Sequence, residues 1–223
     1  WARDYDFPAA NDGRVIKAAF KTGLPAGMNG LVFNTRRPLF ADKRVRQALT
    51  LLFDSEWQNQ NLYFGLFART EGFFDGSELS SVDQPATPKE HELLAAYSDV
   101  ILPEVMAGTF RQPISDGSGT DRSNKREALK LLKDAGYDQV DGKLINLATN
   151  QPVAFEMLAE NREQERLFLV YARALQDIGI DVQIRFVDAT QYQSRQTKFD
   201  FDMIQNNWLA SLSPGNEQSY RWS

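Results

Sequence analysis

The stretch that decides the fold runs from Leu24 to Trp57 and reads LPAGMNGLVFNTRRPLFADKRVRQALTLLFDSEW. A short apolar run at 31–33 follows turn-forming glycines and predicts a buried strand. After Pro38 the period becomes helical, with Asp42 as the expected N-cap. Apolar residues then recur at i, i+3, i+4, i+7 and i+8, on Val45, Ala48, Leu49, Leu52 and Phe53. The stretch therefore predicts a strand, a loop and an amphipathic helix.

The same stretch resembles the signature segment of the family 5 solute-binding proteins of ABC importers, the oligopeptide and dipeptide binders. The resemblance is carried by Asn34-Thr35, Arg37-Pro38-Leu39-Phe40, Asp42 to Leu49 and Asp54. Phe53 to Trp57, with Ser77-Glu78-Leu79, is similar to the YejA-like branch. The resemblance implies an α/β fold, namely one lobe of a two-lobed periplasmic-binding-protein fold (type II, family 5 class) with a mixed sheet flanked by helices.

Both ends of the chain are rich in aromatic residues, from Trp1-Ala2-Arg3-Asp4-Tyr5 to Arg221-Trp222-Ser223, whereas most termini are polar. We therefore expect residues 1–223 to be excised from a longer protein, and the resemblance implies that they are the C-terminal-half lobe, ligand-binding lobe II, of a solute-binding protein. The partners implied by the resemblance are the missing lobe I of the same chain, the permease subunits of an ABC transporter, and a peptide or modified-peptide ligand. The implied location is the periplasm, with a signal peptide on the full-length precursor.

Composition is that of a folded globular protein: 42% of the 223 residues are hydrophobic and 25% are charged. The formal net charge of −5 argues against nucleic acid as a partner. Cysteine is absent, which excludes a disulfide framework and any thiolate chemistry. No run approaches the roughly 18 apolar residues that a transmembrane helix requires.

Two helices and a loop are predicted in the middle of the chain. Thr87-Pro88-Lys89-Glu90 has the pattern of a capping box, and Leu94, Tyr97 and Ile101 would form the stripe of that helix. Ser123 or Asn124 is expected to cap a second helix, which Gly136 ends. The loop between them, PISDGSGTD at 113–121, alternates oxygen-bearing residues, but it lacks the glycine and the distal glutamate of a calcium loop. We expect a surface loop and no metal.

The second half of the chain alternates strands and helices. Runs at 144–147 and 153–158 predict a hairpin, because turn residues join them. The stripe of 165–178 predicts a helix that ends at Gly179, and the alternation of 182–186 predicts a strand directly after it. Such a unit implies a right-handed crossover onto a shared sheet. A short helix over 190–196 and a strand over 199–204 complete the expected order.

The final stretch is where we predict ligand contact. Three consecutive carboxamides offer donors and acceptors to a backbone-like ligand, and an adjacent tryptophan offers a flat apolar wall: Gln205, Asn206, Asn207 and Trp208. The alternative is that the amides cap a strand end and the tryptophan packs in the core. Asn34 and Arg46 are further candidates, each of which could equally be structural.

Ser211 is the last candidate, and it departs from the family's pattern. In the oligopeptide binders the loop after this tryptophan offers an aspartate to the ligand's ammonium group, and Ser211 stands near that position. A serine cannot supply the charge. The resemblance therefore implies a charge partner elsewhere, or a blocked or modified ligand.

Enzyme chemistry has little support. His91 is the only histidine and sits between two glutamates, as a surface residue would. No nucleophile elbow, dinucleotide fingerprint or P-loop occurs. Asp200 and Asp202 could in principle form the carboxylate pair of a hydrolase, although such a pair more simply marks a solvent-facing strand face. We expect no catalytic residue and no cofactor. The alternatives are a binder of sugars, opines or nickel chelates on the same scaffold, and an interaction module without a ligand.

Overall fold

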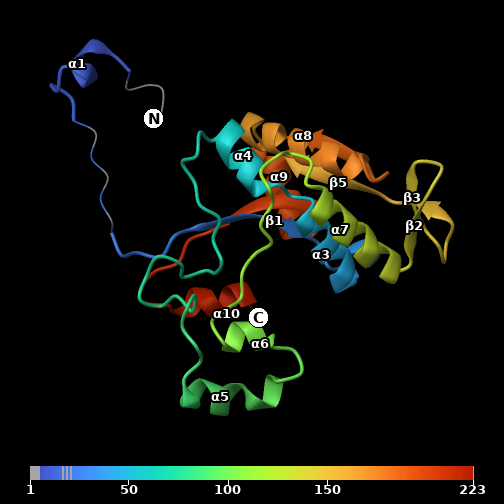
Figure 1. The fold of residues 1–223 in the computed structure, drawn as a ribbon, viewed down its shortest axis with the longest axis horizontal. Helices are drawn as coiled ribbons and strands as arrows, with labels where there is room; N and C mark the ends of the chain where they lie inside the picture. Colours follow the sequence, from blue (N-terminus) through green and yellow to red (C-terminus); the bar gives the residue numbers. More distant parts are fainter. Residues whose placement is uncertain (1–5, 17, 19, 21, 223) are drawn as a thin grey trace. The chain divides into compact units, whose positions relative to one another are not determined.

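The structure is a computed structural model, which describes residues 6–16, 18, 20 and 22–222 (Figure 1). The chain divides into two compact units. Unit 1 takes the described residues up to Met28, then 68–112 and the residues from Asn207 onward, and unit 2 takes 29–67 and 113–206. Each unit is treated by itself. No helix in the described ranges is both long and apolar enough to cross a bilayer.

Unit 2 is built on a four-stranded sheet. Its order is β1 (Met28–Phe33), β7 (Met203–Trp208), β5 (Ala154–Ala159) and β6 (Asp181–Phe186), although Met28, Asn207 and Trp208 are counted with unit 1. β5 runs parallel to both of its neighbours, with Met157 opposite Ile184 on β6 and Met203 on β7. The Asn34 N–H donates to the Asp202 carbonyl (3.0 Å), which puts the end of β1 beside the start of β7. β1 is therefore antiparallel, and the sheet is mixed, as predicted.

Six helices flank this sheet: α2 (Pro38–Ala41), α3 (Lys43–Leu51), α4 (Ser55–Leu62), α7 (Arg122–Asp134), α8 (Arg162–Gln176) and α9 (Ala189–Thr197). The predicted N-cap of α3 is confirmed, because the Asp42 side chain accepts from the Arg44 N–H. The stripe is buried from Val45 to Leu52. Phe53 is only partly buried, since Asp54 starts the next helix by capping α4. Figure 1 shows α3 and α7 side by side.

The β5–α8–β6 unit confirms the predicted crossover onto one sheet. Asn161 caps α8 by accepting from the Gln164 N–H, and Gly179 follows the helix with a left-handed φ of +86°. β5 lies between β7 and β6. Its side chains Phe155, Met157, Leu158 and Ala159 are buried, as expected where both faces of a parallel strand are covered. Every buried apolar side chain found in the described ranges belongs to unit 2.

The predicted hairpin is wrong over most of its length. The second sheet is antiparallel, in the order β2 (Tyr137–Val140), β3 (Lys143–Asn146), β4 (Gln151–Pro152). Return pairing onto β3 ends at Val153, whose N–H donates to the Leu144 carbonyl (2.8 Å). Beyond it the chain enters β5, because the apolar run there gains more from burial between two parallel neighbours than from continuing a hairpin.

Two other boundaries differ from expectation. The N-cap of α7 is Asp121, whose carboxylate accepts from the Ser123 and Asn124 N–H groups, so neither of those residues is the cap. The last strand begins at Met203 instead of residue 199, because Phe199 has a left-handed φ of +54° that no strand accommodates. The short helix predicted over 190–196 is confirmed as α9.

Unit 1 holds α1 (Pro8–Asn11), α5 (Pro88–Leu94), a 3₁₀ turn η1 (Ala95–Tyr97), α6 (Pro103–Met106) and α10 (Asn216–Trp222). The capping box is confirmed, since Thr87 and Glu90 bond to each other's backbone N–H groups. The stripe predicted to follow it is not buried: Tyr97 is 59% exposed, and α5 has no buried residue. His91 is exposed on α5, as predicted.

Candidate functional site

The candidate site in unit 2 lies toward the carboxyl end of the parallel strands. Ligands of open α/β sheets bind outside this edge. Gln205 and Asn206 are the two middle residues of β7. Glu160 and Asn161 follow β5, and Asp188 follows β6 and caps α9. Polar residues on or directly after three parallel strands thus lie toward the same edge of the sheet. The strand predicted over 199–204 put the two amides directly beyond its end, whereas the structure places them within β7.

Gln205 is fixed through both its side chain and its main chain. Its Nε2 donates to Oδ1 of Asn29 on β1 (2.8 Å), and its carbonyl oxygen accepts from the Tyr192 hydroxyl (2.6 Å). Asn206 is half-buried, and no hydrogen bond of its side chain is found in the described part of the chain. The Asn206 amide therefore has a donor and an acceptor to offer to a ligand.

The remaining strand-end candidates belong to unit 1. Asn207 is exposed, and Trp208 is half-buried with its ring edge-to-face against Phe73, at a centroid distance of 6.1 Å. Ser211 is exposed and donates from its hydroxyl to the Ser213 carbonyl (3.1 Å). Trp208 keeps partly exposed apolar surface, which a ligand wall requires.

Asn34 and Arg46 are engaged in holding backbone. Asn34 is 3% exposed; its amide nitrogen donates to the carbonyls of Phe199 (2.9 Å) and Phe201 (2.7 Å), and its amide oxygen accepts from the Arg36 N–H. Arg46 donates to the carbonyls of Phe40 (2.6 Å) and Ala41 (2.9 Å) at the end of α2. These bonds use both donor hydrogens of the Asn34 amide and both of the Arg46 Nη1 group, so we do not carry Asn34 or Arg46 into the proposed site.

Asp200 and Asp202 are bound up in an ion-pair cluster at the amino ends of β5 and β7. Arg37 pairs with Asp202 (3.0 Å) and Asp200 (3.3 Å). The Arg195 guanidinium pairs with Glu156 (2.8 Å), whose own N–H donates to Asp202 (2.9 Å). The two aspartates do not form the solvent-facing strand face that we expected, since both precede β7. Arg37 pairs with each aspartate, so the two are engaged in ion pairs and are not arranged as the two facing carboxylates of a hydrolase.

Sequence reasoning missed two buried residues near Gln205, namely Tyr192 and Gln164. Tyr192 of α9 is 5% exposed, and burial, reinforced by the negative charge of Glu160, raises its pKa to about 12. Gln164 of α8 is 9% exposed, and its side-chain oxygen accepts from the Glu160 N–H (2.8 Å). The available signal was a single aromatic residue in the otherwise polar helix 189–197.

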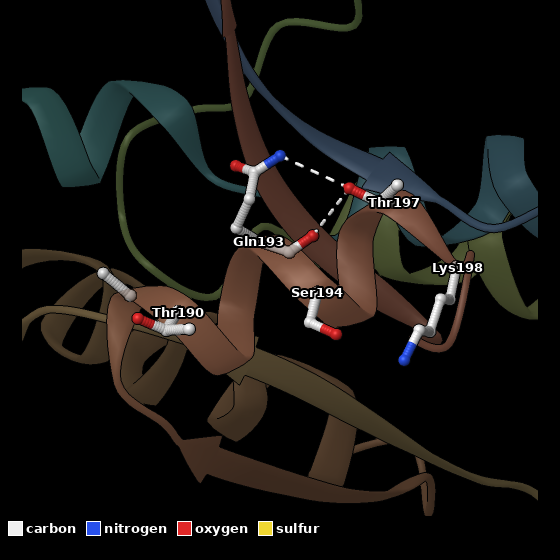
Figure 2. Close-up of a pocket in the computed structure, with 6 residues that line it drawn as sticks. Thr190, Gln193, Ser194, Thr197 and Lys198 are labelled. Atoms are coloured by element: carbon white, nitrogen blue, oxygen red, sulfur yellow. Dashed lines mark hydrogen bonds between the residues drawn. The ribbon is translucent and has the colours of Figure 1, made fainter.

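A pocket of about 600 Å³ lies against α9 and is lined by Ala189, Thr190, Gln193, Ser194, Thr197 and Lys198. Figure 2 shows these residues. The polar groups of the pocket bond within the helix: the Thr197 hydroxyl donates to the Gln193 carbonyl (2.9 Å). All lining residues are exposed and come from one helix, so we do not place the site there. No group of three or more potential metal ligands is found in the described ranges.

The sequence matches the family model of the bacterial extracellular solute-binding proteins, family 5 Middle, over residues 2–223. Among the most similar curated proteins is one named as a binding protein in Brucella suis biovar 1, 51% identical over 222 residues. The peptidoglycan-binding protein YepA and the probable peptide-binding protein YejA, both of Agrobacterium fabrum, are 43% and 40% identical. All three alignments cover 100% of this chain and 36% of the relative, so the chain spans about a third of the length of the curated relatives it matches.

Solved structures share the fold. The oligopeptide-binding protein AppA of Bacillus subtilis, in complex with a nonapeptide, has a TM-score of 0.56 at 24% identity, over 86% of this chain and 33% of that one. A periplasmic oligopeptide-binding protein of Thermotoga maritima, bound to mannohexaose, has a TM-score of 0.61 at 16% identity, over 90% and 33%. NikZ of Campylobacter jejuni, in complex with Ni(L-His), has a TM-score of 0.59 at 18% identity, over 86% and 32%. The predicted α/β architecture is confirmed.

Proposed function

Because the chain belongs to family 5 of the bacterial extracellular solute-binding proteins, we propose that it is a ligand-binding lobe of the substrate-binding component of an ABC importer. Its ligands are peptides or modified peptides, captured in the periplasm and delivered to a membrane permease. The observation that carries the proposal is the pair of amides on β7, Gln205 and Asn206, near the carboxyl end of the parallel strands. A strand that presents amide donors and acceptors suits a ligand recognised through its main chain.

The names of relatives support a peptide-like ligand. One relative is a peptidoglycan-binding protein and another a probable peptide-binding protein, and AppA holds a nonapeptide. In this chain, Ser211 stands where an aspartate for the ligand's ammonium group is expected. A modified peptide, or one whose amino group is held elsewhere, therefore fits better than a simple free peptide.

We further propose that residues 1–223 form the C-terminal-half lobe, lobe II, and that lobe I is supplied by the rest of the full-length protein. Solute binders close two lobes around a ligand by hinge motion, so one lobe offers about half of the contacts. The chain by itself should therefore bind a ligand much more weakly than the full-length protein. Tight peptide binding by the isolated chain in isothermal titration would contradict the half-site.

A second candidate keeps the scaffold and changes the ligand. The Thermotoga protein holds a mannohexaose and NikZ a nickel–histidine chelate, so this fold accommodates sugars and metal chelates. Trp208 could serve a sugar ring as readily as an apolar side chain, because its face is flat and apolar. Binding of a sugar, an opine or a chelate is therefore the alternative.

The test is a thermal-shift screen of the full-length protein against di- to octapeptides, murein-derived peptides, sugars and nickel chelates. A ligand that binds only the folded state raises the melting temperature. We expect a shift with a peptide or murein peptide that is lost in Trp208→Ala. Trp57→Ala is the matched control, because Trp57 lies on α4 and packs against Gly119; this variant should keep the shift. A shift with sugars or chelates alone would overturn the peptide ligand and leave the family unaffected.

A further inference from the structure

On the side of β7 that faces β5, the hydrogen-bond partner changes at Gln205. β5 pairs with β7 at Met157–Met203 and Leu158–Ile204, where the register ends. At the next residue, the Gln205 carbonyl accepts a hydrogen bond from the Tyr192 hydroxyl (2.6 Å), a side chain of α9. A phenol therefore satisfies the main chain of β7 directly beyond the strand pairing.

The tyrosine is well placed to hold this point. Its ring is buried in a small apolar cluster with Leu158, Val187, Phe201 and Ile204, so it has little freedom to move away. Helix α9 is thereby tied to β7 through a side chain that is more than nine-tenths buried.

The bond fixes the main chain of a candidate ligand-binding residue whose side chain is also oriented, since Gln205 Nε2 donates to Asn29 (2.8 Å). A small displacement of the β7 main chain would move the Gln205 side chain and that of Asn206, which follows it. Hydrogen bonding to a ligand depends strongly on distance and angle. A group that restricts this main chain thus reduces the ordering that binding would otherwise require.

We propose that Tyr192 is a positioning residue for ligand binding: its hydroxyl holds β7 at Gln205 so that the Gln205 and Asn206 side chains meet the ligand in a fixed arrangement. The proposal rests on the proposed function of this edge as a solute site. Tyr192 acts through the β7 main chain and needs no ligand contact of its own.

The experiment compares Tyr192→Phe with Tyr171→Phe in the full-length protein. Both changes delete one buried phenol-to-carbonyl hydrogen bond, because the Tyr171 hydroxyl donates to the Leu49 carbonyl (2.7 Å) in the main core. The two variants should therefore lose similar amounts of stability. Affinity for the peptide found in the thermal-shift screen should fall about fivefold only in Tyr192→Phe. This is the value of one neutral hydrogen bond between the amides of β7 and the ligand, lost through misplacement. Equal affinities in the two variants would overturn the proposal.

A double-mutant cycle tests whether Tyr192 acts through Gln205. In a Gln205→Ala background, Tyr192→Phe should cost much less affinity than it does alone, because the side chain that it orients is gone. Fully additive losses would contradict the positioning role.

Amide hydrogen exchange of the ligand-free protein separates this proposal from the proposed function. Exchange over 203–208 should accelerate in Tyr192→Phe and stay at the wild-type rate in Tyr171→Phe. Unchanged exchange would overturn the positioning role whatever ligand is found. Accelerated exchange in a protein that binds none of the screened compounds would support the hold on β7 and count against the solute site.

Discussion

At the residue scale, two carboxylates hold a loop of unit 2 onto α4. The Ser115 hydroxyl lies within hydrogen-bond distance of both Asp54 and Glu56, and the Ser115 N–H donates to Glu56 (3.1 Å). The Gly119 N–H donates to Asp54 (2.8 Å). Burial acts to raise the pKa of Glu56, but the bonds from Ser115 and Ser55 outweigh it and hold this pKa below its usual value. The loop predicted as a surface loop is thus attached by a charge.

A lowered pKa gives this attachment a definite pH dependence. Its contribution to stability is fully present above the unfolded pKa of about 4.5 and is lost as the pH falls through the folded value. We expect Glu56→Gln to cost about 1 kcal/mol at pH 7, through loss of charge-assisted hydrogen bonds, and the cost to shrink below pH 4.5. Urea unfolding from pH 7 to pH 3 measures it. Glu127→Gln, which removes only an exposed 3.7 Å ion pair, should stay within about 0.5 kcal/mol of wild type at pH 7. A cost that grows toward low pH would contradict the assignment.

Asn34 shows what a residue type alone does not reveal. An asparagine at a strand end was a reasonable ligand contact, and the same donors serve equally well to bond the carbonyls of Phe199 and Phe201. The distinction depends on residues more than 160 positions away in sequence. No local pattern carries that information.

At the scale of elements, two helices of unit 2 end in the same way and differ in their surroundings. Gly136 follows α7 with a φ of +91°, and a Cβ there would meet nothing within 4 Å. Gly179 follows α8 with a φ of +86°, and a Cβ there would come within 2.6 Å of the Leu144 amide nitrogen. The second glycine is required both for its backbone conformation and for the approach of the β2–β3 hairpin.

These two glycines form a matched pair of predictions. Gly136→Ala should cost about 1 kcal/mol, the strain of a left-handed alanine. Gly179→Ala should cost roughly 3 kcal/mol or more, because the same strain is joined by a clash with backbone that cannot rotate away. Chemical denaturation of both variants measures the difference. Equal costs would show that the hairpin does not pack as closely on this turn as the structure indicates.

Helices were predicted more accurately than strand pairings because the sequence signals of a helix lie within the helix and next to it. The stripes of α3, α7 and α8 are periodic within the segment itself, and their caps lie next to them in sequence. The apolar runs at 144–147 and 153–158 indicated strands correctly but not their partners. β5 pairs with β6 and β7, which begin 22 and 44 residues after β5 ends. The pairing energies of these strands depend on the assembled sheet.

At the scale of the whole molecule, the buried apolar residues found in the described ranges all lie in unit 2. Both units expose some large apolar side chains, but those of unit 1, among them Leu93 (63%), Tyr97 (59%) and Val100 (70%), have no buried apolar side chain beside them within the described part of their unit. Apolar surface of this extent is unusual for a part that is stable by itself. Under the proposal that the chain is one lobe of a longer protein, we expect the rest of that protein to cover these residues.

Limited proteolysis tests this difference between the units. In the isolated 223-residue chain, we expect the first cleavages within 68–112, because segments with few buried apolar side chains open at low free energy. Residues 113–206 should resist at the same protease concentration. In the full-length protein the cleavages within 68–112 should slow. First cleavage within 113–206, or equal rates in the two proteins, would contradict the dependence of unit 1 on the rest of the chain.

The sequence by itself determined the α/β class, the apolar stripes of α3, α7 and α8, the caps of α3 and α5, the resemblance to family 5 and the stretch at 205–208 where ligand contact is proposed. These features are written in local periodicity, cap residues and motif. Only the tertiary structure decided that β5 leaves its hairpin for the parallel sheet, that Asp200 and Asp202 join arginines, that Asn34 serves the backbone, and that Tyr192 holds Gln205. Each of these depends on burial and hydrogen bonding between segments far apart in the chain, and the free energy of such contacts exists only once the segments have met.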